Sequence, residues 1–371
     1  MKNISIRSTT VLSIIGSLSI GLMLLVEFTK TEQTQSFFQE KMIAAKSMEG
    51  CIDYLKFTHF KDEITIDNIN DPNDTRIIGA RYSSITSGRG SLPIKLSTVN
   101  PNFAALVVEL FKEAKLKKGD HIAIGATGSF PALNIAVCIA AETIGLELSF
   151  ISSVTSSSWG ANDPDYTYLD IHSSLIKGKF IKHRIIASSI GANQDIGRTI
   201  SPEGREQARQ AMERNGVDFI NGQSLDENIA ERMKIFKQKD LELKKRIKLY
   251  VNIGGGVASL GSAANSEVLP TGLLKDVKLD IFADKKGVMF EMASKKIPLV
   301  NLKNLQYLML KYGLPRDPVP LPEAGEGKLF YDLKYDLRYV FGSTAFLTLL
   351  ILSVIVFDKK QNALGNEIIQ N

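Results

Sequence analysis

Residues 121–153 read HIAIGATGSFPALNIAVCIAAETIGLELSFISS and contain three apolar runs separated by a small-residue loop and a glycine. The runs at 121–124 and 146–151 are short and continuously apolar, which is typical of strands covered on both faces. Residues 130–144 have the length of a helix, and a helical crossover of this size can join two parallel strands. The stretch therefore predicts a strand–helix–strand unit of a parallel sheet.

The same alternation continues toward the C-terminus. Further strands are expected at 184–190, 217–220 and 249–253. Ser201-Pro202 predicts the start of a helix, and a capping box from Ser224 to Glu227 predicts the start of another. One more strand and helix are expected at 290–298 and 302–312. We predict an α/β fold, a mostly parallel sheet with helices on both faces in a Rossmann-like arrangement, flanked by two transmembrane helices.

Both ends of the chain carry apolar segments of membrane-spanning length. Residues 9–26 and 339–357 contain no charged side chain. Lys2 and Arg7 precede the first segment, and two lysines follow the second, so the positive-inside rule places both termini in the cytoplasm and the middle of the chain outside. Basic residues on the opposite flanks leave the reverse orientation open.

These features divide the chain into six parts. Composition places a loosely amphipathic helical stalk after the first apolar segment and a proline-rich spacer before the second. The expected parts are a transmembrane signal anchor (1–28), a stalk and the segment leading into the domain (29–99), the α/β domain (100–312), a proline-rich linker (313–338), the second transmembrane helix (339–357) and a cytoplasmic tail (358–371).

The composition excludes several functional classes. The net charge of +5 is small, and basic residues alternate with acidic ones, so no nucleic-acid footprint is evident. The two cysteines cannot form a disulfide scaffold, and no Cys/His spacing predicts a zinc site. The loop at 125–131 matches neither a Walker loop nor a dinucleotide fingerprint, and no cofactor is assigned.

Four loops rich in small residues follow predicted strands, at 125–131, 152–165, 188–199 and 254–262. The carboxyl ends of parallel strands share one edge of the sheet, where open α/β sheets bind ligands. Free backbone N–H groups there suit a carboxylate or phosphate. The alternative is that each loop is only a tight turn that lets the helix pack on the sheet and has no ligand. The candidate binding residues are Gly125, Thr127, Gly128, Ser129, Ser156, Ser157, Trp159, Asn162, Asn193, Arg198, Gly254, Gly255 and Gly256.

Candidate catalytic residues lie in the same loops. Asp163, Asp165 and Asp195 could act as general bases, or could bind a hard cation together with Asn193. Ser129 could be a nucleophile, but its context lacks the nucleophile elbow and favours a role as helix cap. Whether the protein is an enzyme is left open, as is a bound metal.

The motifs GATGSFPALNIAV, SSSWGANDPDYTYLDI, GANQDIGRTISPEGREQA and NIGGGVASLG resemble signature stretches of the bacterial poly-gamma-glutamate system protein family. The resemblance runs from the first apolar segment to Pro322. It implies a role in making, exporting or releasing poly-gamma-glutamate, a polymer with one free carboxylate per residue. It assigns no catalytic residue.

The expected function is that of a membrane-anchored accessory protein that binds the polymer, or its glutamate end, at the strand-end loops. The expected partners are poly-gamma-glutamate and the other proteins of its synthesis and export. Two alternatives are an amide-bond hydrolase or transferase acting on the polymer, and a structural assembly subunit of the synthase complex. In the last case Gly342, Ser343 and Ala345 could line a contact between membrane helices.

Overall fold

The computed structural model describes residues 8–58, 67–276, 279 and 285–370, and for residues 361, 362 and 364–370 it describes the backbone alone. The chain forms two compact units. One consists of residues 1–35 with 331–371, and the other of residues 36–330. The second unit contains the sheet and every strand-end loop identified above, and it is described first.

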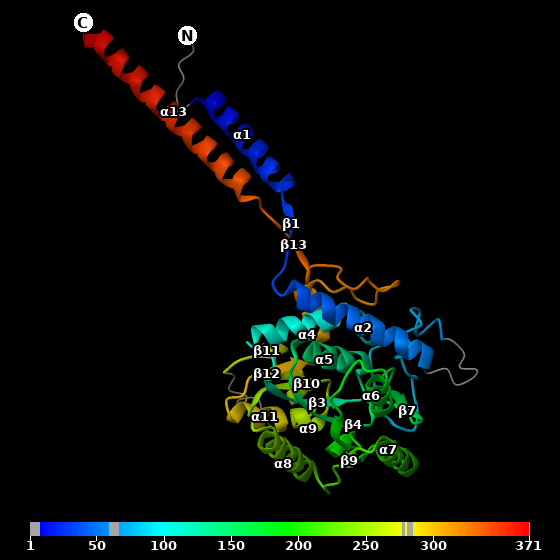
Figure 1. Cartoon of the computed structure of the whole chain (residues 1–371). Coiled ribbons are helices and arrows are strands. Elements are labelled where there is room, and N and C mark those ends of the chain that lie inside the picture. The colour runs from blue at the N-terminus through cyan, green and yellow to red at the C-terminus, as the bar shows by residue number, and fades with distance from the viewer. Residues whose placement is uncertain (1–7, 59–66, 277–278, 280–284, 371) are drawn as a thin grey trace. The chain divides into compact units, whose positions relative to one another are not determined.

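A seven-stranded sheet forms the centre of this unit, as the sequence predicts (Figure 1). All strand pairs are parallel except the one at the β11 edge. The strands in spatial order are β9 (Asp218–Phe219), β8 (Ile185–Ser189), β4 (Glu147–Ser153), β3 (His121–Thr127), β10 (Ile247–Ile253), β12 (Leu299–Leu302) and β11 (Gly272–Leu274).

Helices cover both faces of the sheet. One layer contains α2 (Phe38–Thr58), α4 (Asn102–Glu113), α5 (Pro131–Ile144) and α6 (Tyr168–Lys177), and the opposite layer contains α8 (Leu225–Leu243), α9 (Val257–Leu260) and α11 (Val288–Ser294). Strands β3 and β4 are buried on both sides, which explains why their sequence is mostly apolar, and their buried polar residues include His121 and Ser149. The remaining elements are α3 (Leu92–Thr98), η1 (Asn193–Asp195), α7 (Pro202–Asn215), α10 (Asn265–Val268), α12 (Leu305–Tyr312), β2 (Thr86–Gly88), β5 (Ser156–Ser157), β6 (Asn162–Asp163) and β7 (Tyr166–Thr167).

The predicted helix starts at Ser201 and Ser224 are confirmed, because each cap depends only on residues in the first turn of its own helix. The Ser201 side chain accepts a hydrogen bond from the Gly204 N–H and caps α7, which ends at Gly216 in the left-handed conformation. Ser224 caps α8 through the Glu227 N–H. The return bond of that capping box is absent, because the Glu227 carboxylate accepts from Gln223 instead.

Three expected segments differ in the structure. The predicted stalk is in part α2, whose Ala44, Met48 and Leu55 are buried against the α/β unit, because α2 packs on α4 and α5. The predicted strand at 290–298 is largely helix α11, and the strand follows at β12. The predicted proline-rich linker is divided: residues 313–330 pack on the unit through bonds such as Asn73 Nδ2 to the Pro318 carbonyl (2.9 Å), and residues 331–338 belong to the first unit.

The first unit joins the two ends of the chain. Its helices α1 (Thr9–Phe28) and α13 (Leu337–Gln370) are connected to an antiparallel pair of strands, β1 (Thr31–Thr34) and β13 (Tyr331–Lys334). Two spans, Thr9–Phe28 and Leu337–Lys360, are long and apolar enough to cross a membrane. Half-buried residues recur every three or four positions on both helices and form the seam between them: Val11, Ile15, Ser19, Leu22 and Val26 on α1, and Val340, Ser343, Leu347, Leu350 and Val354 on α13.

Candidate functional site

The strand order reverses between β3 and β10. From β3 the chain adds β4, β8 and β9 on one side, then returns to place β10 and β12 on the other. In open α/β sheets the connections after the two central strands diverge at such a point and leave a crevice where ligands bind. Here the two connections are the 128–130 loop after β3 and the 254–256 glycine loop after β10.

A small cavity of about 20 Å³ lies at this reversal, which is room for about one water molecule. It brings together groups from four strand ends, since its lining includes Thr127 of β3, Ser153 of β4, Asp195 after β8 and Gly256 after β10. Buried polar side chains complete its wall: Arg232, Tyr250, Asn252 and Ser259.

Asn252 carries an unsatisfied acceptor in this wall. Its side chain is fully buried, and its Nδ2 donates to the Gly254 carbonyl (3.0 Å) and to Asn301 Oδ1 (2.8 Å). Both partners are acceptors, which fixes the orientation of the amide. The Asn252 Oδ1 atom has no hydrogen-bond partner among the residues that the structure describes, and a buried acceptor of this kind favours a water molecule in the cavity.

Asp195 is held by a buried ion pair. Its Oδ2 lies 2.7 Å from Arg232 Nη1, and its Oδ1 accepts a hydrogen bond from Ser189 Oγ at 2.8 Å. Asn228 Nδ2 donates to the Asp195 carbonyl at 3.0 Å. Asp195 itself has a left-handed backbone with φ of 61°. A carboxylate with this many partners positions Arg232 and the loop, and is poorly suited to act as a general base.

The glycine loop after β10 offers unused donors. Gly254 donates its N–H to the Leu302 carbonyl, whereas the N–H groups of Gly255 and Gly256 make no hydrogen bond within the part of the chain that the structure describes. Gly255 is exposed, and a β-carbon there would meet nothing within 4 Å. A β-carbon on Gly256 would lie 2.9 Å from the Thr127 methyl group, so this loop and the end of β3 are in contact.

Lys95 lies beneath the loop after β3 and is not among the candidate residues predicted from the sequence. Its side chain is 2% exposed, with Nζ hydrogen-bonded to the Ser129 carbonyl and to Ser157 Oγ (3.0 Å) and 4.0 Å from the centre of the Phe130 ring. Burial lowers the pKa of Lys95 to about 7. Helical spacing from Leu92 to Lys95 and Leu96 could have placed it on an inner face.

The loop after β4 uses its own N–H groups internally. Ser156 donates to the Ile85 carbonyl, Ser157 to Ser129 Oγ, and Trp159 to the Ala80 carbonyl. The Asn162 side chain is committed as well, to the main chain of Ala80 and to Thr86 Oγ1. The main-chain N–H groups of Ser156, Ser157 and Trp159 and the Asn162 amide, which were predicted to bind an anion, are therefore already engaged, and the loop anchors the 80–90 segment.

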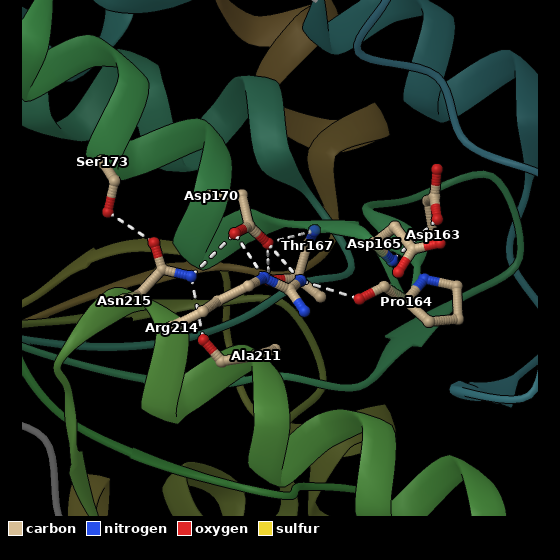
Figure 2. A network of polar contacts seen from close by, with 9 residues as sticks. All are labelled: Asp163, Pro164, Asp165, Thr167, Asp170, Ser173, Ala211, Arg214 and Asn215. Carbon is tan, nitrogen blue, oxygen red and sulfur yellow. Dashed lines mark hydrogen bonds and ion pairs between the residues drawn. The ribbon is translucent and has the colours of Figure 1, made fainter. Parts of the chain in front are cut away.

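Asp163 and Asp165 lie in the loop beside the contact between Asp170 of α6 and Arg214 of α7 (Figure 2). Asp165 donates its N–H to Asp163 Oδ1, and the carbonyl of Pro164 accepts from Arg214 Nη2 at 2.7 Å. No three His, Cys, Asp or Glu side chains within the described residues gather around a common point. The suggested cation site from Asp163, Asp165, Asp195 and Asn193 is therefore not formed.

Ser129 is neither cap nor activated nucleophile. Helix α5 begins after Phe130, with no side-chain cap, because Ser129 Oγ accepts the N–H of Ser157. Within the described part of the chain, no histidine or carboxylate is hydrogen-bonded to that hydroxyl. Asn193 and Arg198 are exposed, and the Arg198 guanidinium forms no hydrogen bond or ion pair with other described residues.

A serine, a histidine and an aspartate also line up at the amino edge of the sheet. His121 Nε2 lies 2.7 Å from Ser149 Oγ, and His121 Nδ1 lies 2.9 Å from Asp240 Oδ1. Ser149 and His121 are fully buried, so no substrate reaches the hydroxyl. Burial lowers the pKa of His121 despite the neighbouring Asp240, and the arrangement is a structural network.

No protein-family model and no curated protein matches this chain. Solved structures that align with it include Escherichia coli diaminopropionate ammonia lyase in its apo form, at 10% identity over 92% of this chain and 89% of that chain, with a TM-score of 0.16. The selenomethionine-labelled holo form of the same enzyme aligns at 8% identity over 92% and 90%, again with a TM-score of 0.16. A likeness this weak carries no argument about fold or function.

Proposed function

We propose that this protein is a membrane-anchored accessory protein of poly-gamma-glutamate synthesis, export or release, and that its α/β unit binds glutamate carboxylates where β3 and β10 end. The sequence motifs support the pathway. The two apolar terminal helices support the anchor. The geometry of the glycine loop supports the kind of ligand, as follows.

The observation that carries the proposal is the pair of unused N–H groups on Gly255 and Gly256 at the reversal of strand order. Adjacent main-chain donors with no side chain in front of them bind anions well. The cavity behind them is lined by Arg232 and Asn252 and has room for about one water molecule, which would link an N–H group of the ligand to the unsatisfied Asn252 Oδ1. A γ-linked glutamate supplies both a carboxylate and an amide N–H.

Binding is favoured over cleavage. Among the described residues no histidine or carboxylate is hydrogen-bonded to the Ser129 hydroxyl, Lys95 Nζ contacts the Ser129 carbonyl and not its hydroxyl, and Asp195 is committed to Arg232 and Ser189. The hydrolase alternative would therefore require a different arrangement of these side chains.

Replacing Gly256 tests the site with a matched pair of variants, because the β-carbon displaces the Thr127 methyl group equally in both. Gly256 has φ of −60°, which proline adopts, and its N–H is unused by the fold. Gly256→Pro removes one donor, whereas Gly256→Ala adds the same β-carbon and keeps it. With the full chain in detergent, Gly256→Pro should weaken binding of a short γ-glutamyl oligomer by roughly tenfold or more, the worth of a hydrogen bond to a charged group. Equal affinities for the two variants, measured by calorimetry, would rule out the site.

The orientation is part of the proposal, with the α/β unit outside the cytoplasm. Both native cysteines are buried in the unit. A cysteine introduced at exposed Ser294 should therefore be the main target of a membrane-impermeant maleimide. We expect labelling in intact cells; labelling only after lysis would reverse the assigned orientation.

A further inference from the structure

Three lysine-rich loops meet at the amino edge of the sheet, opposite the site described above. They precede the neighbouring strands β3, β10 and β12, so the parallel topology places them side by side. In sequence the first two loops are 126 positions apart and the last two are 47 positions apart, and each loop has the composition of an ordinary solvated turn. Their exposed basic residues are Lys115, Lys117 and Lys118, then Lys244, Lys245, Arg246 and Lys248, then Lys295 and Lys296.

A groove of about 590 Å³ runs between these loops. Its lining includes five basic side chains and one acidic one, Asp240, which is engaged with His121. Lys248 pairs with Asp120 at 2.7 Å. The other four, Lys115, Arg246, Lys295 and Lys296, have no ion pair among the described residues. The groove therefore carries surplus positive charge.

Backbone conformation sets these lysines apart from ordinary surface residues. Lys115, Lys244 and Lys296 have φ of 62°, 53° and 58°, the left-handed region that favours glycine. Each follows a helix, and the next residue closes the turn with a 6→1 bond, as in Leu116 N–H to the Phe111 carbonyl. Gly145 and Gly216 occupy this position after α5 and α7. The helix dipole favours a cation near the C-terminal end of each of these helices. It does not require a lysine at the left-handed position, where glycine is the least strained residue.

We propose that this groove binds a linear polycarboxylate chain, which on the function proposed above is poly-gamma-glutamate itself. A row of unpaired cations matches a polymer with a carboxylate on every residue. The groove lining contains no aromatic residue, so it offers no stacking surface for the bases of a single-stranded nucleic acid. The strand-end site would take the glutamate end, and the groove would take the chain.

The left-handed lysines allow a test that does not depend on damaging the fold. The variant carries Lys115→Gly, Lys244→Gly and Lys296→Gly, each of which relieves backbone strain while removing a charge. The matched control carries Lys177→Gln, Lys179→Gly and Lys182→Gln. It loses the same charge from the loop before β8, and Lys179 also has a left-handed φ, of 63°.

Binding of fluorescently labelled poly-gamma-glutamate to the full chain in detergent is measured by anisotropy over a range of salt concentrations. The groove variant should bind roughly tenfold or more weakly at low salt and show a shallower salt dependence, while the control stays within about twofold of the parent. Equal losses in both variants would show that net charge alone is responsible and would overturn the groove. An unchanged groove variant would overturn it too.

Three further measurements distinguish this proposal from a membrane contact, from a different polymer and from the strand-end site alone. If the groove variant keeps polymer affinity but loses binding to anionic lipid vesicles, the face is a membrane contact and the proposal fails. If the parent protein does not bind poly-gamma-glutamate but binds polyacrylate through the groove, the groove is a polycarboxylate site and the proposed polymer is wrong. If Gly256→Pro weakens polymer binding and the groove variant does not, the result supports the proposed function and contradicts a role for the groove.

Discussion

At the scale of single residues, Lys95 is an ionisable side chain that is buried away from solvent. Burial lowers its pKa from 10.5 to about 7, so the unfolded chain holds a proton that the folded chain releases between these values. Stability therefore rises with pH in that window, by about 2 kcal/mol between pH 7 and pH 9. We expect this rise in urea unfolding of the parent and its loss in Lys95→Met. An equal rise in both would assign the pH dependence to other groups.

Gly125 is another residue whose identity the packing dictates. A β-carbon there would lie 2.0 Å from the Tyr250 hydroxyl, which is hydrogen-bonded to Ser259 at 2.8 Å. Gly125→Ala should reduce the free energy of unfolding by about 1–3 kcal/mol, the usual effect of overpacking. Adding Tyr250→Phe removes the clashing oxygen, so the double variant should recover part of that loss. A thermodynamic cycle with additive effects would contradict the contact.

At the scale of elements, Asp170 ties helix α6 to helix α7 (Figure 2). Its carboxylate accepts from Thr167 at the start of α6 and bidentately from Arg214 on α7, at 2.8 and 2.7 Å. Burial raises the pKa of Asp170, but the bonds to Arg214, Asn215 and Thr167 outweigh it and lower the pKa overall. The stabilisation is thus present at neutral pH and is lost as the pH falls through the lowered pKa.

Asp170→Asn should therefore cost about 2–4 kcal/mol at pH 7, because a charge-assisted pair and a helix cap are lost together. The matched change Asp165→Asn lies on the exposed part of the same loop and should cost no more than about 0.5 kcal/mol. Chemical unfolding at pH 7 and pH 4 measures both. A difference between parent and Asp170→Asn that grows in acid would contradict the assigned direction.

At the scale of the whole molecule, residues 36–330 form a unit with its own core. We expect a fragment with these limits to be expressed as a folded protein with a single cooperative unfolding transition. A fragment of residues 100–312 lacks α2, whose Ala44, Met48, Cys51 and Leu55 are buried, and should be insoluble or unfolded. Circular dichroism and thermal unfolding of the two fragments check this, and a stable 100–312 fragment would show that α2 is dispensable.

Much of the molecule follows from local chemistry in the sequence. Apolar runs of strand length, the caps at Ser201 and Ser224 and the glycine after α7 indicate a parallel α/β sheet, because each depends on residues within a few positions. The two terminal helices follow from length and lack of charge. The convergence of strand-end loops follows from parallel strands alone.

Only the tertiary structure decided which groups in those loops remain available. The donors after β4 are consumed by the 80–90 segment, while those of Gly255 and Gly256 are not, and this depends on contacts between residues distant in sequence. Lys95, Arg232 and Asn252 became site residues for the same reason. The basic groove likewise exists because strand order sets three separate lysine loops side by side, which no local pattern specifies.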